Sequence, residues 1–525
     1  MESSERLALC IENKDWDTLV SILKPKDFCS DIPRTLCDFN KLLKVAELLT
    51  DKDFNISEKI KSILLKCLAN SCVNGYLEKA YVPNDGGDIS AHKNIYKFLS
   101  QEVSNWSEEG PYPFHINFPY DGVVRWAIKT ITDYASTQKR LSEDQTEVLR
   151  LSLQFLCNFF TFAFNISTST NADVIMEYIK DQNFKDTIIK LVGHDRAPIA
   201  RAACAYVHNM VKQLFKEFYA TIDKKELTAE LIKSTISDIQ AALDTVILLL
   251  KEPNYLKDIY DEISIDDRLY LLDIIHQEVR SFVYNEENKN THWLPIESIE
   301  FLSDKFKKKS DLILKTVNSE LNNIEPTEVT ILIDILGVLT SNPKLDECKK
   351  LQEDKSLLIN CVYLLKAIHM VGKDTNNCFT PLQKLSDLAL HTKADCCNEA
   401  EDPNNHVCKE KIQNHPAFGF KASLIRVIGN LVHKHEKNQN LVRENDGIPL
   451  LLDCCNIDAR NPLIIQWTTL AIRNLVDKNP ENQEVIGKSV KIGVVDSAVV
   501  REMGLTLHDE GEGNAIGIMP LPKKD

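Results

Sequence analysis

The amino-acid sequence predicts an all-α solenoid, and three observations indicate this fold. One pattern occurs twice: LIRVIGNLVHKHEKNQNLV is followed by TLAIRNLVDKNPENQEVI, so that Asn430 and Leu431 recur as Asn474 and Leu475, 44 residues later. Apolar residues make up 43% of the chain, and 17 glycines with 19 prolines are too few for a loop-dominated protein. Because each repeat of a solenoid packs only on its neighbours, a chain of 525 residues can form one continuous array.

Each repeat is predicted to contain three helices. A short helix in NQNLVREN is followed by a turn at Gly447 and by a second helix that begins near Pro449. The third helix is longer and apolar, and we expect it over residues 461–477. The dipeptides Asn461-Pro462 and Asn479-Pro480 mark its start and its end.

The order of these helices and of the Gly-Ile-Pro turn resembles an armadillo repeat. A period of about 40 to 47 residues with two or three helices is typical of HEAT and armadillo arrays. The sequence is thus predicted to form an armadillo-type right-handed superhelical solenoid of about eight to ten three-helix repeats. The asparagine that ends the third helix is also found upstream, at Asn70, Asn158 and Asn209, although chance is an equal explanation for Asn70. Gly337 is expected at the asparagine position of another repeat, where it interrupts the series.

Four parts are expected along the chain. Residues 1–285 form an N-terminal helical block, and residues 286–416 form central helical repeats with an insertion at 391–416. Residues 417–487 contain the best-formed repeats. The remaining residues, 488–525, hold five of the 17 glycines and are expected to form a tail with a short helix near 496–503 and either a short extended pair or disorder.

Composition excludes several classes of function. With 62 basic and 77 acidic residues the formal charge is −15, which opposes binding to nucleic acid phosphates. The first residues, MESSERLALCIENKDW, lack a secretory leader, and the most apolar run, LQFLCNFFTFAF, is shorter than a membrane span. The 15 cysteines are an odd number scattered through apolar runs, as expected in a reducing compartment. We therefore expect an intracellular protein with no membrane span.

The sequence offers little for catalysis or for metal binding. Six potential zinc ligands, His391, Cys396, Cys397, His406, Cys408 and His415, lie within 25 residues, but they lack the Cys-x2-4-Cys spacing of zinc clips. An inter-repeat insertion explains them better. Phosphate-binding glycine loops, nucleophile elbows and His-Glu-x-x-His helices are absent from the sequence. We therefore expect no enzyme activity, no cofactor and no bound metal.

The segments LIRVIGNL, DGIPLLLDCCNIDARNP and WTTLAIRNLVDKNPENQ closely resemble the C-terminal domain of the ataxin-10 family, over residues 417–510. This resemblance implies a non-enzymatic scaffold with roles in neuron survival, neurite outgrowth, cytokinesis and signalling. The implied partners are a transferase of intracellular O-linked sugars and heterotrimeric G-protein subunits, and a homo-oligomer is left open. The implied location is cytoplasmic or perinuclear, with association at the midbody or centrosome. The alternative function is a nuclear transport adaptor, which would need a regular Trp-Asn ladder and an acidic groove.

A protein-binding surface is expected on the long helices of the last two repeats. Its candidate residues are Ser423, Arg426, Asn430, Trp467, Arg473 and Asn474. Positions seven residues apart on a helix share a face, so Trp467 and Asn474 lie together, as do Ser423 and Asn430. An asparagine there could clamp a peptide backbone, or it could bridge adjacent helices. Likewise, Trp467 could be part of a groove or part of the core.

Overall fold

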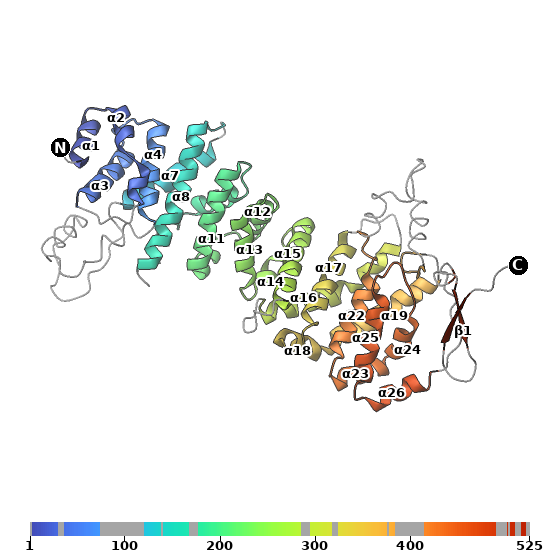
Figure 1. Ribbon diagram of the computed structural model, residues 1–525. Coiled ribbons are helices and arrows are strands. Elements are labelled where there is room, and N and C mark those ends of the chain that lie inside the picture. Colours follow the sequence, from blue (N-terminus) through green and yellow to red (C-terminus); the bar gives the residue numbers. More distant parts are fainter. Residues whose placement is uncertain are drawn as a thin grey trace, which may run out of the picture. The chain divides into compact units, whose positions relative to one another are not determined.

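The computed structural model describes most of the chain, and the account below concerns these residues alone. They are 3–29, 36–73, 120–137, 140–166, 177–284, 294–317, 324–374, 377–383, 414–489, 501, 505–509 and 516–520. Contacts between helices divide the chain into unit 1, Met1–Glu252, and unit 2, Pro253–Asp525 (Figure 1).

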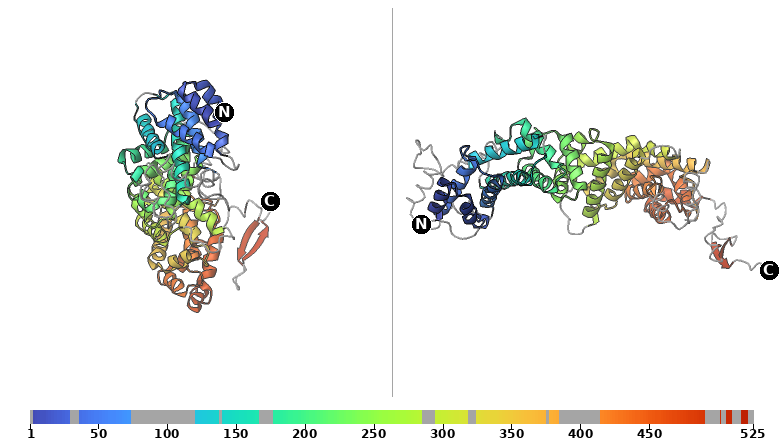
Figure 2. Two further views of the ribbon diagram at one scale, coloured as in Figure 1. Left: turned by 90° about the vertical axis from the view of Figure 1, so that its left-hand side faces the viewer. Right: turned by 90° about the horizontal axis from the view of Figure 1, so that it is seen from above.

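Unit 1 is entirely helical in its described part. Its elements are α1 (Ser3–Glu12), α2 (Trp16–Ile22), the 3-10 helix η1 (Pro25–Phe28), α3 (Leu36–Thr50), α4 (Glu58–Ser71), α7 (Tyr120–Ser136), α8 (Glu143–Ile166), α10 (Gln182–Val192), α11 (Ala197–Tyr219), α12 (Lys224–Ile236) and α13 (Gln240–Leu250). Helices α4, α8, α11 and α13 each pack on the next, and we call them the spine of unit 1. Figure 2 shows the helices of this unit following one another in sequence order.

Unit 2 repeats this plan and ends in two strands. Its elements are α14 (Tyr255–Ile259), α15 (Ile265–Tyr284), α16 (Ile296–Lys309), the 3-10 helix η2 (Ser310–Val317), α17 (Ile324–Leu339), α18 (Asp346–Glu353), α19 (Lys355–Asp374), α22 (Phe420–Leu431), α23 (Glu436–Glu444), α24 (Gly447–Asp453), α25 (Ile464–Val476), α26 (Pro480–Gly487), β1 (Leu505–Asp509) and β2 (Ile516–Pro520). The spine of unit 2 is α15, α17, α22 and α25. The prediction of an all-α helical-repeat fold is confirmed, and the described chain contains eight spine helices.

The division between the units falls earlier than the boundary expected at residue 285. Helix α15 lies before the polar segment 285–293 and α17 lies after it, yet the two helices pack directly on each other. This segment therefore connects helices of one unit, and the contacts divide the chain at Glu252 instead.

The best-formed repeat, α23 to α25, follows the predicted order with two local differences: α25 begins at Ile464 rather than at residue 461, and the turn before α24 is displaced by one residue. Helix α25 ends at Val476 and α26 begins at Pro480, where the Asn479 side chain accepts the N–H of Asn482, as the Asn-Pro signal predicts. The expected turn at Gly447 is made by Asp446, whose φ is 56°. Gly447 is instead the first residue of α24, and a Cβ there would approach Val442 Cγ1 to 2.5 Å. Glycine is therefore needed at this position for close packing.

The tail contains the extended pair that the sequence predicted as one alternative. Strands β1 and β2 are antiparallel, with Leu505 opposite Pro520 and Asp509 opposite Ile516. The short helix expected near 496–503 falls almost wholly outside the described residues. Among the described helices, α19 is long and apolar enough to cross a membrane by length and composition, although it packs against α16, α22, α23 and α24.

Candidate functional site

A shallow depression of about 650 Å³ crosses the C-terminal ends of three spine helices of unit 2. It is lined by Thr340, Ser341 and Pro343 after α17, by Asn430, His433 and Lys434 at the end of α22, and by Leu470, Arg473, Asn474, Val476, Asp477, Lys478 and Gln483 from α25 onward. Three of the six candidate residues, Asn430, Arg473 and Asn474, therefore belong to one surface.

The depression is basic although the protein is acidic. Lys434, Arg473 and Lys478 are exposed, and none of them forms an ion pair with a described residue. Asp477 is the one carboxylate among the described lining residues. Three cations therefore face a single anion, which gives the surface a positive potential and favours an acidic partner.

The two lysines are equivalent residues of successive repeats. Lys434 and Lys478 both have a left-handed backbone, with φ of 50° and 57°. Each precedes the residue that caps the next short helix, His435 before α23 and Asn479 before α26. The repeat geometry therefore places one lysine at the same edge in each layer.

Asn474 and Asn430 use their side-chain amides to join neighbouring spine helices. Asn474 Nδ2 donates to the Gly429 carbonyl at 2.9 Å, and its Oδ1 lies 3.3 Å from His433 Nδ1. Asn430 Nδ2 contacts the Gly337 carbonyl at 3.3 Å and Thr340 Oγ1 at 3.1 Å. Both donors are thus engaged within the fold, which is the bridging role that the sequence left as an alternative to a peptide clamp.

The same bridge occurs in unit 1. Asn158 Nδ2 donates to the Ala69 carbonyl at 3.1 Å, so it joins α8 to α4. Asn209 Nδ2 lies 2.9 Å from Thr161 Oγ1 and 3.1 Å from Cys157 Sγ, so it joins α11 to α8. The recurring asparagine therefore marks genuine repeats. In each of them its side chain hydrogen-bonds the spine helix to the preceding spine helix.

This pattern corrects the position expected for Gly337. Asn474 bonds to Gly429, which directly precedes Asn430, and Asn430 bonds in the same way to Gly337. Gly337 is therefore equivalent to Gly429, and Val338 occupies the asparagine position. The sequence alone missed this shift of one residue because Gly337 is itself flanked by aliphatic residues.

Glutamines of the short helices cap the long helices beside the depression. Gln439 Nε2 donates to the Asn474 carbonyl at 2.8 Å, and Gln352 Nε2 donates to the His433 carbonyl at 3.1 Å. These carbonyls lie at or just beyond helix C-termini, where main-chain acceptors lack helical partners. The buried glutamines therefore hold the rim of the depression in place.

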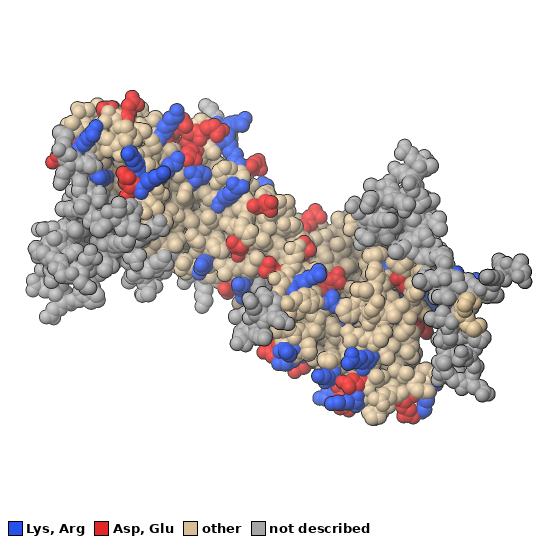
Figure 3. All heavy atoms as spheres, in the orientation of Figure 1, with Lys and Arg blue, Asp and Glu red and all other residues tan. Residues whose placement is uncertain are grey.

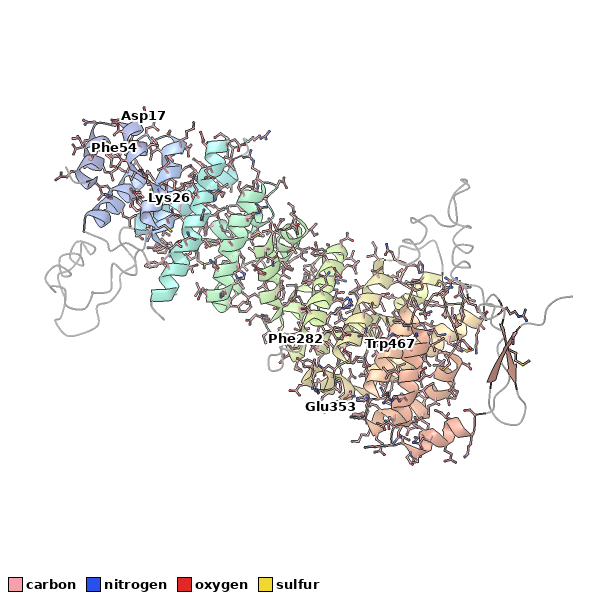
Figure 4. All side chains as sticks on the ribbon, viewed as in Figure 1. Asp17, Lys26, Phe54, Phe282, Glu353 and Trp467 are labelled. Carbon is pink, nitrogen blue, oxygen red and sulfur yellow. The ribbon has the colours of Figure 1, made fainter. Side chains whose placement is uncertain are left out.

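Arg426 and Trp467 form a second part of the surface, beside the depression. The guanidinium carbon of Arg426 lies 5.2 Å from the centroid of the Trp467 ring, and Nη2 donates to the Tyr284 hydroxyl at 3.2 Å. Trp467 is half-buried and lies on α25, in the right-hand half of the view in Figure 4. Figure 3 shows that the same face is largely uncharged over α22 and α25. Arg426 Nε is buried and has no hydrogen-bond partner among the described residues.

Ser423 points to a partly buried carboxylate rather than to the depression. Its hydroxyl donates to Asp334 Oδ1 at 2.7 Å. Burial raises the pKa of Asp334, while the Ser423 hydrogen bond, His276 and Arg426 act in the opposite direction. Burial also lowers the pKa of His276. Ser423 therefore joins α22 to α17.

The structure brings the six candidates to one stretch of α22 and α25 and gives them different roles. Ser423, Asn430 and Asn474 link helices, Arg426 stacks on Trp467, and Arg473 faces solvent at the depression. Sequence reasoning missed Lys434 and Lys478 as site residues. Their recurrence at a spacing of 44 residues was the signal that could have identified them.

We predict that the cluster of His and Cys residues between His391 and His415 binds no metal. Most of these residues lie outside the described chain. Of the six potential ligands, only His415 is described, and its Nδ1 accepts the N–H of Ala417 at 3.2 Å. Within the described ranges, no group of three or more His, Cys, Asp or Glu side chains is arranged to hold a metal ion.

We expect Asn474→Ala to destabilise unit 2 by about 1 to 3 kcal/mol, because the buried Gly429 carbonyl loses its donor. Trp467→Ala should cost about 1 kcal/mol, since cation–π contacts of half-buried rings are weak, compared with about 3 to 5 kcal/mol for a fully buried tryptophan. Urea denaturation of both variants tests this order. A larger loss for Trp467→Ala would show that this ring belongs to the core.

Comparison with known proteins identifies relatives of the repeats that form this site. Residues 420–516 match the family model of the spinocerebellar ataxia type 10 protein domain. The chain is 33% identical over 268 residues to ataxin-10 of Macaca fascicularis, covering 50% of each protein. It is 36% identical over 260 residues to ataxin-10 of Xenopus tropicalis, covering 49% of this chain and 48% of the relative. It is 41% identical over 108 residues to the ataxin-10 homolog of Dictyostelium discoideum, covering 20% and 17%. The alignments with the animal relatives thus span about half of their length.

Proposed function

We propose that the chain is a member of the ataxin-10 family and a non-enzymatic scaffold that binds other proteins, because its C-terminal repeats match the family model over residues 420–516. The observation that carries this proposal is the basic depression of unit 2. Its three cations lack described ion-pair partners, and it is built from equivalent positions of stacked repeats. Stacked helical repeats commonly present extended surfaces of this kind to protein ligands.

The partner that fits the depression is an extended protein segment rich in Asp and Glu. Carboxylates can pair with Lys434, Arg473 and Lys478, and the uncharged face over α22 and α25 can accept apolar side chains beside them. The charge opposes the alternative function as a nuclear transport adaptor, because basic cargo requires an acidic groove.

The wider roles of the family belong to the same proposal. We infer a cytoplasmic or perinuclear location and roles in neuron survival, neurite outgrowth, cytokinesis and signalling. The partners inferred are the transferase of intracellular O-linked sugars and heterotrimeric G-protein subunits. Support for these roles is the similarity to ataxin-10 proteins over about half of their length.

Reversing both repeat-equivalent lysines tests the proposal. The double variant Lys434→Glu/Lys478→Glu should bind the purified transferase or G-protein subunits at least about tenfold more weakly, because two attractive contacts become repulsive. Binding is measured with immobilised full-length chain at physiological salt, and circular dichroism checks folding.

A matched control separates this effect from net charge. Lys308→Glu/Lys355→Glu changes the charge equally, and both lysines are exposed on unit 2 away from the depression. The control should bind like the unmodified chain. Equal binding by the unmodified chain and both double variants would show that the depression is not the binding surface.

A further inference from the structure

A second depression, of about 360 Å³, lies in unit 1 among four helices. Its walls come from the end of α7, from Arg140 and Leu141, and from α8, α10 and the start of α11. Helices α7, α8 and α11 are neighbours in Figure 1. The surface described in unit 2 shares no residue with it, so its function is a separate question.

The described lining of this pocket contains cations but no carboxylates. Arg140, Lys190 and Arg196 contribute positive charge. Arg140 and Lys190 are exposed and form no ion pair with a described residue. Arg196 Nη1 contacts Thr146 Oγ1 and lies 3.5 Å from Glu143, whose side chain is 88% exposed and does not line the pocket. The positive charge is therefore largely uncompensated within the pocket.

The neutral side chains supply further N–H donors. His194 Nδ1 accepts the main-chain N–H of Arg196 at 2.9 Å, so the neutral ring carries its proton on Nε2. Burial lowers the pKa of His194, which favours this neutral form. Asn183 lines the pocket, and its side-chain amide makes no described hydrogen bond.

Hydroxyl groups at the pocket already donate their hydrogens to main-chain or side-chain acceptors, so they are not free to donate to a ligand. Thr146 Oγ1 donates to the Ser142 carbonyl at 2.8 Å, and Thr187 Oγ1 donates to the Asn183 carbonyl at 2.7 Å. The donors left for a ligand are therefore nitrogen groups, and most of them are charged. Such a set suits a compact anion with several acceptor oxygens.

We propose that this pocket binds a phosphate group, carried either by a phosphorylated segment of a partner protein or by a small organic phosphate. A phosphate dianion presents enough oxygens to bond Arg140, Lys190 and Arg196 together with an amide or imidazole donor, whereas a single carboxylate presents only two. The volume leaves room for the group to which the phosphate is attached.

The test uses the full-length chain and three probes at constant ionic strength. These are inorganic phosphate, a short peptide that contains phosphoserine, and inositol hexakisphosphate, each measured by isothermal titration calorimetry. Saturable binding of at least one probe is expected. Lys190→Glu should weaken it at least about tenfold, because a cation in contact with the phosphate becomes an anion.

Controls make the result specific. Lys129→Glu changes an exposed lysine of α7 outside the pocket and should leave the affinity unchanged. The unphosphorylated peptide should not bind. A phosphopeptide that binds more tightly than inositol hexakisphosphate assigns the site to a partner protein, and the reverse order assigns it to a small molecule. Absence of saturable binding by all three probes, or equal weakening by Lys190→Glu and Lys129→Glu, would overturn the proposal.

Discussion

Glu328→Ala should destabilise unit 2 by about 3 to 5 kcal/mol, because it leaves two partly buried cations without their shared anion. Glu328 on α17 is 1% exposed, and Lys309 Nζ lies 2.8 Å from each of its carboxylate oxygens. The Tyr260 hydroxyl donates to Oε1 at 2.6 Å, and Arg268 Nη1 lies 3.6 Å from the same oxygen. Burial beside this carboxylate raises the pKa of Tyr260, which keeps the hydroxyl protonated as a donor.

The lower stability of Glu328→Ala should be measurable as weaker protection of α16 and α17 from hydrogen exchange and as a lower urea midpoint. Glu325→Ala is the matched control on the same helix. Its partner Lys315 is 2.7 Å away, but both side chains are about half exposed, so this pair contributes no more than about 1 kcal/mol. Similar midpoints for the two variants would contradict the assignment of Glu328 as the central anion of unit 2.

Gly429→Leu should destabilise the last two repeats by about 3 kcal/mol, because the new side chain has no space between α22 and α25. A Cβ at Gly429 would lie 3.0 Å from both Cα and Cβ of Ala471. The two helices would have to separate, and the hydrogen bond from Asn474 to the Gly429 carbonyl would lengthen. The same change should weaken partner binding, since Asn474 also lines the depression.

The matched control is Gly487→Ala at the end of α26, where an added Cβ meets no atom of a described residue within 4 Å. Alanine has the higher helix propensity, so this control should be neutral or slightly stabilising. Urea denaturation and partner binding are measured for both variants. If Gly429→Leu leaves the stability unchanged, the close approach of α22 and α25 does not contribute to the stability of the last two repeats.

Much of the fold follows from local features of the sequence. The spacing between Asn430 and Asn474 defined the repeat, and Asn479-Pro480 defined where one helix ends and the next begins. Apolar periodicity, helix caps and turn residues act over one or two helical turns. They can therefore be recognised in the sequence without knowledge of the tertiary structure. The family resemblance over the last repeats rests on the same segment.

The division into units could not be predicted from composition. The polar segment 285–293 has the composition of a linker, but α15 and α17 on its two sides pack together. A boundary depends on which helices share a core, and this is decided by contacts between residues far apart in the sequence.

The sequence by itself therefore determined the helical repeats, their period and the helices on which the candidate residues lie. Only the tertiary structure decided what those side chains do, because a polar group is available to a ligand only when the fold has not already bonded it. The Asn474 side chain is hydrogen-bonded to the carbonyl of Gly429, 45 positions away. The Ser423 hydroxyl is hydrogen-bonded to Asp334, 89 positions away. Lys434, Lys478 and Lys190 have no such partner among the described residues, so they remain available to a ligand.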